Sequence, residues 1–279
     1  MKTLQGKITL VTGASRGAGK GIALELAAAG AYVYVTGRSV NGNRTKNRPG
    51  DIDATVEEIE KAGGRGAAVR CDHTDTRDTE SLISRIASEQ GRLDIMVNNV
   101  WGGNALRIDE RPFWEQPLEH WNHMFDSGVR AQLITNYYAI PLMRIQKNGL
   151  IIHTTFWDRY RHISNFYYDL SKNALVRMAC GLSKEIAADG IAVIPLSPGW
   201  MRTELVLDAF HTDEAHWQEV EELKATESTR YIGRAVCALA ADPKIIERSG
   251  VPQQVGCLAE QYGFTDIDGR VVPAFLISE

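Results

Sequence analysis

A tyrosine and a lysine stand four residues apart in the second half of the chain, at Tyr168 and Lys172. On an α-helix this spacing brings both side chains to one face. A free tyrosine has a pKa of about 10, and a neighbouring ammonium group favours the phenolate and lowers that pKa. We therefore predict that Tyr168 is a general acid–base catalyst tuned by Lys172, beside a cofactor that the surrounding fold must position.

A glycine-rich segment near the N-terminus has the composition of a phosphate-binding loop. An apolar run leads into the sequence TGASRGAG at residues 12–19, and a helical pattern begins at once. Gly13 permits a tight turn, Gly17 lets the backbone approach a phosphate, and Gly19 lets helix and strand pack closely. The free N–H groups and the dipole of a helix N-terminus favour an anion, so the segment predicts a pyrophosphate site.

The end of the second apolar run bears on the choice of cofactor. An NAD site usually carries an acid there, which binds the 2′-hydroxyl of the ribose. Here Gly37 and Arg38 occupy that place, and no acid follows until Asp51. An arginine pairs well with a phosphate, and Arg16 inside the glycine loop supplies a second charge. The sequence predicts NADP(H) over NAD(H); the alternative is that both arginines are ordinary surface residues.

Short apolar runs alternate with helical patterns and must position these groups. Strands are predicted at residues 8–11, 32–35, 67–69, 93–97, 150–154 and 191–196, and helices at 17–29, 54–61, 79–89, 118–145 and 168–188. Strands that are apolar on both faces and alternate with helices indicate a parallel sheet covered on both sides. We expect one domain over residues 1–279, with a doubly wound α/β Rossmann-type sheet.

Two polar stretches interrupt this alternation. Residues 39–53 follow the second strand and are rich in Asn, Gly and Arg, as expected of a loop. Residues 200–226 follow the sixth strand and mix apolar with acidic side chains. An insertion at the carboxyl end of a strand lies where such sheets bind ligands, so we interpret residues 200–226 as a substrate lid. A surface helix pair without a role is the alternative.

Bulk composition argues against several other classes of protein. The formal net charge is −4, so no large basic surface invites nucleic acid. No stretch approaches the ~20 apolar residues of a membrane span, and no secretory signal pattern is present. The four cysteines are widely separated and are interpreted as reduced thiols, without a metal. We expect a soluble cytoplasmic protein.

In combination, the motifs resemble the short-chain dehydrogenase/reductase family over nearly the whole chain. The matching features are residues 12–19, Cys71-Asp72, Asn98-Asn99, Tyr168-x-x-x-Lys172, and Pro198-Gly199 with Thr203. Residues 101–103, 112–115, 256–259 and 262–270 also resemble the subgroup close to dehydrogenase/reductase member 1. The resemblance implies hydride transfer between a nicotinamide cofactor and a carbonyl or secondary alcohol.

The resemblance also assigns residues to the cofactor. Asp72 would contact the adenine ring, Asn98 and Asn99 would line the cofactor cleft, and Thr203 would hold the nicotinamide carboxamide. The predicted cofactor site comprises Gly13, Ser15, Arg16, Gly17, Ala18, Gly19, Arg38, Asp72, His73, Asn98, Asn99, Val100, Tyr168, Lys172, Pro198, Gly199, Met201 and Thr203.

Two positions depart from the family pattern. The family carries an Asn on the long helix that relays protons through a bound water; Gly128 takes its place here, leaving space that a water could fill. The family also has a Ser after the fifth strand that polarises the substrate carbonyl. Counting back from Tyr168 places Thr155 there, and its hydroxyl is suited to the same task, whereas counting along the strand places Phe156 there. We predict Thr155 as the third catalytic residue, with Phe156 as the open alternative.

Several neighbouring side chains have two interpretations. His153 and Asp158, beside the fifth strand, are structural or take part in proton transfer. Tryptophans in the predicted cleft loops shape an apolar substrate pocket or simply pack; they are Trp101, Trp114, Trp157 and Trp200.

Activity and assembly are predicted as follows. The first hypothesis is an NADP(H)-dependent carbonyl reductase or alcohol dehydrogenase acting on a small molecule. A degenerate member that binds a dinucleotide or another ligand, and a non-redox lyase or isomerase, are the alternatives. The resemblance further implies a homodimer or homotetramer, whose contact would bury Leu133, Ile134, Leu175 and Val176.

Overall fold

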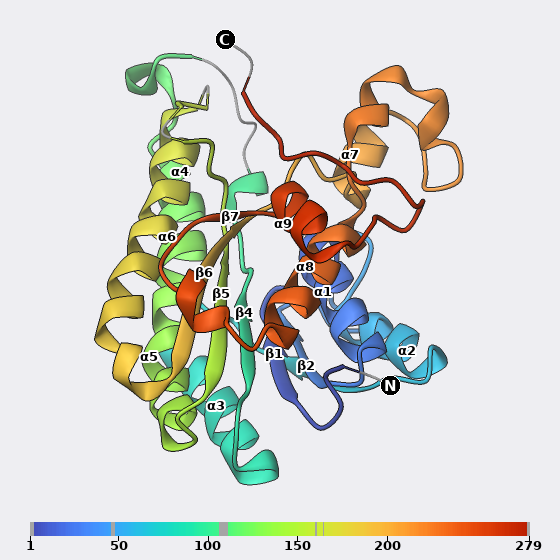
Figure 1. The fold of residues 1–279 in the computed structure, drawn as a ribbon. Helices are drawn as coiled ribbons and strands as arrows, with labels where there is room; N and C mark the ends of the chain where they lie inside the picture. Colours follow the sequence, from blue (N-terminus) through green and yellow to red (C-terminus); the bar gives the residue numbers. More distant parts are fainter. Residues whose placement is uncertain (1–2, 46–47, 106–110, 160, 164, 278–279) are drawn as a thin grey trace.

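Seven strands pair in the order β3-β2-β1-β4-β5-β6-β7, and every pairing is parallel. The computed structural model describes residues 3–45, 48–105, 111–159, 161–163 and 165–277 (Figure 1). The strands are β1 Ile8–Val11, β2 Tyr32–Gly37, β3 Arg65–Arg70, β4 Ile95–Asn98, β5 Gly149–Thr154, β6 Ile191–Ser197 and β7 Gln253–Gln254. The four central strands are buried along their whole length, as their unbroken apolar runs predict.

Helices cover both faces of this sheet and form two separate cores. One face carries α1 Gly17–Ala28, α2 Ile52–Lys61, α8 Thr229–Ala241 and α9 Val255–Tyr262. The other carries α3 Thr76–Gln90, α5 Ala131–Ile145 and α6 Phe166–Glu185. The predicted doubly wound α/β architecture is confirmed (Figure 1).

Helices α1 and α8 approach each other closely because α1 carries a glycine at the contact. A Cβ built on Gly21 would lie 1.9 Å from the main-chain oxygen of Thr229. Gly19 allows an equally close approach to the glycine loop, since a Cβ built on it would lie 2.3 Å from the main-chain oxygen of Gly13. These two positions fix the first turn of α1 between β1 and α8, which sets the direction of its N-terminus.

The long helical region predicted at residues 118–145 is present, but its hydrogen bonding changes along its length. A short helix, α4 Glu119–Trp121, leads into a π-helix over Asn122–Arg130, and α5 follows directly. A π-helix shifts each hydrogen bond by one residue and is frequent at functional sites. The apolar pattern alone does not reveal this shift, because both helix types keep one face apolar.

Elements after residue 226 were not predicted from the sequence. Helix α8 begins behind the N-cap Ser228, whose side chain accepts from the N–H of Arg230. Strand β7 has two residues and is too short to produce a periodic signal. The Ser228 cap was a usable signal, whereas β7 depends on its pairing with β6.

The apolar face expected to carry a subunit contact is only partly available. Leu133 is 53% exposed and Val176 is half-buried. Ile134 and Leu175 lie in the interior of this chain, so their predicted role in a contact is wrong. Tyr137, one turn after Leu133 on α5, is 72% exposed and extends the same surface. None of the helices in the described ranges has both the length and the apolarity needed to span a membrane.

Candidate active site

A cleft of about 1170 Å³ lies at the carboxyl ends of the central strands. The strand order reverses between β1 and β4, and the loops that follow these two strands open the cleft there. All of the predicted cofactor residues line it except Gly19 and Asn98. Residues predicted from separate motifs, including Arg38, Asp72 and Tyr168, are therefore brought together at one site.

Asn98 was expected in the cleft, and this expectation is wrong. The side chain is fully buried, and its Nδ2 donates to Asn136 Oδ1 at 2.9 Å. Asn136 Nδ2 lies 3.3 Å from His153 Nε2, and His153 Nδ1 lies 2.7 Å from Gln132 Oε1. Burial lowers the pKa of His153 to about 3, so the ring is neutral. Neither Asn98 nor His153 reaches the cleft, and the structural interpretation of His153 fits this arrangement.

The glycine loop presents its N–H groups at the start of α1. Gly17 has a φ of +55°, a conformation that favours glycine. The Gly17 N–H donates to Glu204 Oε2 at 2.9 Å and to Oε1 at 3.2 Å. Asn99 secures the loop from β4, because its Nδ2 donates to the oxygens of Thr12 and Gly13. Glu204 was not predicted, and its distance in sequence from the loop left no local signal.

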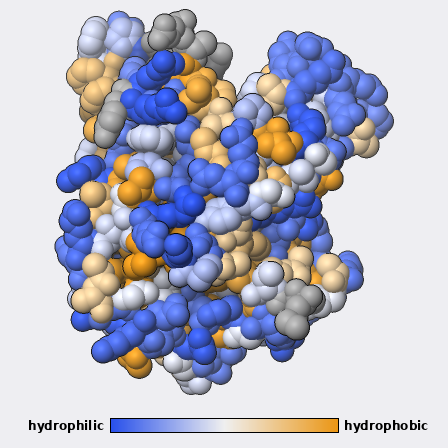
Figure 2. Space-filling model, in the orientation of Figure 1, coloured by the Kyte–Doolittle hydropathy of each residue, from blue (hydrophilic) through white to orange (hydrophobic). Residues whose placement is uncertain are grey.

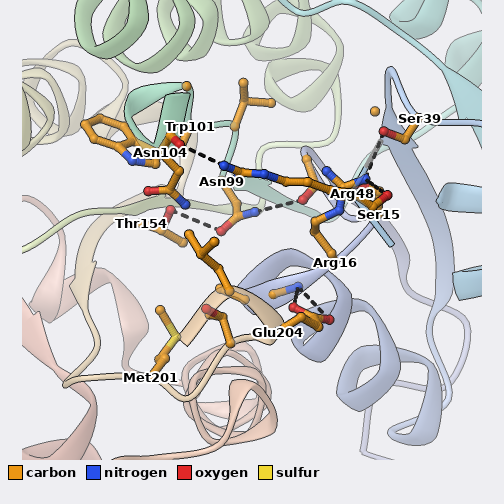
Figure 3. A pocket seen from close by; sticks show the side chains of 18 of the residues that line it. Ser15, Arg16, Ser39, Arg48, Asn99, Trp101, Asn104, Thr154, Met201 and Glu204 are labelled. Carbon is orange, nitrogen blue, oxygen red and sulfur yellow. Dashed lines mark hydrogen bonds between the residues drawn. The ribbon is translucent and has the colours of Figure 1, made fainter. Parts of the chain in front are cut away.

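Arginines surround the part of the cleft near β2. Arg38 follows β2 directly, and its Nη1 lies 3.5 Å from Asp72 Oδ2. Arg16 donates to the main-chain oxygens of Pro49 and Gly50, both at 2.8 Å, so this side chain organises the loop after β2. Arg48, which sequence reasoning missed, also lines the cleft and donates to the oxygen of Asn104 at 2.9 Å (Figure 3).

Arg16 and Arg48 together join both sides of the cleft through the loop after β2. Residues 46–47 of that loop lie outside the described residues. Burial lowers the pKa of the Arg16 guanidinium, and the charge of Arg48 adds to this effect. Positive charge is thus concentrated where a phosphate of a cofactor would need it.

Tyr168 and Lys172 both reach the cleft from α6. The helix starts at an Asn165 cap, whose side chain accepts from the N–H of Tyr168 at 2.9 Å. Lys172 Nζ lies 5.5 Å from the centre of the Tyr168 ring. Burial lowers the pKa of Lys172 to about 7.

Burial also shifts the pKa of Tyr168, and in the direction opposite to the one expected from the sequence. Desolvation of the phenolate raises the pKa of Tyr168, and the neighbouring Asp169 adds to the rise. The lowering predicted from Lys172 is not found, because the loss of water around the phenolate sets the direction of the shift. Tyr168 consequently keeps its proton at neutral pH.

Three consecutive side chains at the end of β5 line the cleft beside Tyr168. The Thr155 hydroxyl donates to the main-chain oxygen of Lys172 at 2.7 Å, so its proton is engaged within the protein. The Phe156 ring lies 6.3 Å from the Tyr168 ring, between centroids. Thr154, which was not considered from the sequence, also lines the cleft, and its hydroxyl lies 3.4 Å from Asn99 Oδ1 (Figure 3).

The space beside Gly128 is occupied by the ring of Trp101. A Cβ built on Gly128 would lie 2.8 Å from Cζ3 and 2.9 Å from Cε3 of that indole. The expectation that a water could fill this space is therefore wrong. Trp101 lines the cleft, whereas Trp114, Trp157 and Trp200 do not.

The segment interpreted as a lid forms part of the wall of the cleft. Helix α7, Glu204–Ala209, begins behind Thr203, and its apolar residues pack on Trp217 and Leu223. Arg202 anchors the segment: its buried guanidinium lies 4.0 Å from the Trp217 ring centre and 3.3 Å from Glu214 Oε2. Figure 1 shows the segment around α7 as a lobe at the upper right, and Figure 2 shows that the surface of this lobe is largely hydrophilic. Its cleft-lining residues are Met201, Thr203, Glu204, Leu205, Leu207, Asp208, Thr212, Asp213 and Glu214.

Asp158 and the candidate metal ligands lie apart from this chemistry. Asp158 is buried outside the cleft and accepts from the N–H of Ile277 at 2.6 Å, so it holds the C-terminal segment. Within the described ranges, no three His, Cys, Asp or Glu side chains cluster closely enough to hold a metal ion. All four cysteines are free thiols.

Comparison with known proteins identifies the family that has this site. A family model for the short chain dehydrogenases matches residues 7–214. The chain belongs to the short-chain dehydrogenase family. Its members are oxidoreductases, and the predicted resemblance is confirmed.

Relatives at similar length support the family assignment. Dehydrogenase/reductase SDR family member 1 of Mus musculus is 34% identical over 96% of this chain and 86% of that protein. Hydroxynaphthalene reductase of Aspergillus fumigatus is 30% identical over 91% of this chain and 84% of that protein. The crystal structure of a short chain dehydrogenase from Mycobacterium thermoresistibile has a TM-score of 0.82 and 25% identity, covering 99% of this chain and 95% of that one.

Proposed function

We propose that this short-chain dehydrogenase uses NADP(H) to interconvert a carbonyl compound and a secondary alcohol. The observation that carries the proposal is the convergence of separate motifs in one cleft. The Gly17 loop, Arg38 and the Tyr168–Lys172 pair all line it. A pyrophosphate on the loop and a nicotinamide near Tyr168 would place donor and acceptor groups side by side.

Tyr168 is proposed to supply or accept the proton. When bound, NADPH supplies a hydride to the carbonyl carbon. Tyr168 then donates its hydroxyl proton to the carbonyl oxygen, which gives the alcohol and leaves a phenolate beside Lys172. Because burial keeps Tyr168 protonated, the protein is prepared for reduction at neutral pH. The Thr203 hydroxyl accepts from the Val206 N–H and donates to none of the described residues, so its proton would be available for the carboxamide.

Replacing Tyr168 tests the proposal directly. Tyr168→Phe keeps the ring and removes the proton donor, so turnover of NADPH with a panel of ketones, aldehydes and quinones should fall by at least about 10²-fold. NADPH affinity should hold. Tyr167→Phe, on the neighbouring buried ring, is the matched control and should keep its activity. Near-normal turnover in Tyr168→Phe would refute the mechanism.

Thr155 is proposed as the group that polarises the carbonyl, after rotation away from the Lys172 oxygen. Thr155→Val keeps the shape and removes the hydroxyl. A large loss of turnover would assign this role to Thr155, whereas unchanged turnover would support the alignment that places Phe156 at the serine position.

NADP(H) is proposed over NAD(H) because Arg38 stands at the end of β2, where an NAD site would have an acid. A similar solved structure from Beutenbergia cavernae, 25% identical with a TM-score of 0.72, holds bound NADP. A charge-assisted bond to the 2′-phosphate is worth roughly 1.5–3 kcal/mol, so Arg38→Ala should lose about 10-fold or more in NADPH affinity. NADH affinity should change little. Equal NADPH and NADH affinities in the unmodified protein, by calorimetry, would contradict the assignment.

A ligand-binding member without redox activity is the second candidate. The observation in its favour is the engagement of the Thr155 proton by the Lys172 oxygen. This candidate predicts tight dinucleotide binding and no turnover of any carbonyl in the panel. The Tyr168→Phe variant should then match the unmodified protein in both respects.

Assembly and lid movement complete the proposal. We expect a homodimer or homotetramer whose contact includes Leu133 and Tyr137 on α5, because both are well exposed. Light scattering that shows a monomer at micromolar concentration would contradict this expected assembly.

Residues 200–226 are expected to act as the substrate lid, since several of them line the cleft. The free thiols suit a reducing compartment such as the cytoplasm.

A further inference from the structure

Trp101 has a setting that no other tryptophan of the described chain shares. Glycines face two edges of its ring: a Cβ on Gly103 would lie 2.3 Å from Cζ2, and one on Gly128 would lie 2.8 Å from Cζ3. Gly128 belongs to the π-helix Asn122–Arg130, which displaces the backbone locally. Loop and helix are thus both shaped to admit an indole at this one place.

The face of this ring is directed at the candidate catalytic pair. Lys172 Nζ lies 3.7 Å from the centre of the Trp101 ring, which is within cation–π range. The Tyr168 ring meets Trp101 edge-on, with 5.6 Å between centroids and an interplanar angle of 85°. The described residues offer the Lys172 ammonium no hydrogen bond or ion pair.

We propose that Trp101 is a positioning residue, whose indole face holds the Lys172 ammonium in its charged form beside Tyr168 and whose bulk requires glycine at position 128. This inference rests on the proposed function of Tyr168 and Lys172. It deepens that function by identifying what holds the lysine where the family uses an Asn and a water.

The physical basis is the cost of burying an ammonium group. Lys172 is 8% exposed, and burial lowers its pKa to about 7. An indole face attracts a desolvated cation through its quadrupole, and tryptophan does so best among the aromatic residues. The attraction favours the charged lysine without needing a hydrogen-bond acceptor. Other titratable groups at this part of the site are Tyr168 and Asp169 on α6 and His123, which lines the cleft.

Two substitutions separate the π-face from simple bulk. Trp101→Leu removes the face and keeps an apolar side chain, whereas Trp101→Phe keeps a face of smaller area. The readout independent of turnover is the pH dependence of Lys172 acetylation by acetic anhydride, followed by mass spectrometry. In Trp101→Leu the midpoint should fall by about one pH unit, because the charged form has lost its partner. Trp101→Phe should restore most of that shift.

Turnover of NADPH with phenanthrenequinone gives the second readout. A fall of one pKa unit lowers the charged fraction about fivefold at a pH equal to the original pKa. The alkaline decline of the reduction rate should therefore move to lower pH in Trp101→Leu, while NADPH affinity stays within about threefold. Gly128→Ala should reproduce the effect by displacing the ring. Gly128→Ala combined with Trp101→Leu should be no worse than Trp101→Leu alone, because both act through the same ring.

The inference is overturned if Trp101→Leu leaves the acetylation midpoint unchanged, or if the Phe and Leu variants are equally impaired. Additive losses in the double variant would also overturn it, since Gly128 would then act independently of Trp101. A protein that needs Tyr168 for turnover but ignores Trp101→Leu refutes this inference alone. A protein that ignores Tyr168→Phe refutes the proposed function, while the acetylation measurement still tests Trp101.

Discussion

Glu204 occupies the Gly17 N–H that the proposed cofactor would need, and we expect the two to compete for it. Its carboxylate accepts the Gly17 N–H at 2.9 and 3.2 Å, the same donor that a pyrophosphate oxygen would use. A phosphate oxygen on that N–H would lie within about 4 Å of the carboxylate. Glu204→Gln keeps an oxygen that can accept from Gly17 and removes the negative charge. We expect this variant to bind NADPH more tightly.

The magnitude follows from distance and exposure. Glu204 is exposed, so screening is close to that of water. At 4 Å one pair of like charges then costs about 1 kcal/mol, and a pyrophosphate carries two charges. The expected gain is about 1–2 kcal/mol, which corresponds to a roughly 5- to 30-fold lower Kd. Salt screens such exposed charges, so the gain should shrink at high ionic strength.

Titration calorimetry with NADPH at low and high salt measures both quantities. Asp208→Asn is the matched control, because Asp208 is another exposed acid of residues 200–226 that lines the cleft without bonding to the glycine loop. It should gain clearly less affinity than Glu204→Gln. Unchanged or weaker binding by Glu204→Gln would refute the reasoning, and so would a gain that is insensitive to salt or equal to that of Asp208→Asn.

Two further predictions concern stability. Gly21→Ala places a Cβ 1.9 Å from the Thr229 oxygen and should lower the free energy of unfolding by about 1–3 kcal/mol or more. The control is Gly181→Ala, where no atom lies within 4 Å on an exposed helix face, and it should raise the free energy of unfolding by up to about 1 kcal/mol. Denaturant titrations that give equal effects for the two variants would contradict the packing argument. Burial raises the pKa of Glu227 from 4.5 to about 8, so the folded state holds a proton that the unfolded state loses in that window, and stability falls as pH rises through it. Glu227→Gln should remove this contribution, about 1.4 kcal/mol per pKa unit, and an unchanged pH slope of thermal stability would rule it out.

Local motifs predicted most of the residues that line the cleft, because residues close in sequence formed each motif. Tyr168 and Lys172 share a helix face by periodicity, and the glycine loop combines a strand end with a helix start. Asn98 and Asn99 show the limit of this reasoning. Adjacent side chains in a strand point to opposite sides, and here Asn99 lines the cleft whereas Asn98 is buried behind it. Which of them does so depends on the buried network around Asn136, which is remote in sequence.

Contacts between segments far apart in the chain could not be predicted from the sequence. Glu204 meets Gly17 across 187 positions, and Arg48 meets Asn104 across 56. No periodicity links such pairs, because they depend on where residues 200–226 and the loop after β2 lie relative to the sheet in the folded chain. The pKa of Tyr168 could not be predicted either, because the direction of its shift follows from burial rather than from the spacing to Lys172.

The departure from the family pattern at Gly128 is interpreted differently when its position in the structure is compared with that of Trp101. Gly128 in isolation suggests a lost proton relay, and Trp101 in isolation suggests an ordinary packing residue. Together they are complementary in volume, because the ring fills the place that a side chain at position 128 would need. A site decaying after loss of activity has no reason to fill that place with an aromatic face directed at the lysine ammonium. The absence of the family's Asn is therefore weaker evidence against catalysis than the sequence alone suggests. The hydrogen bond from the Thr155 hydroxyl to the Lys172 main-chain oxygen is the observation that still favours a ligand-binding interpretation.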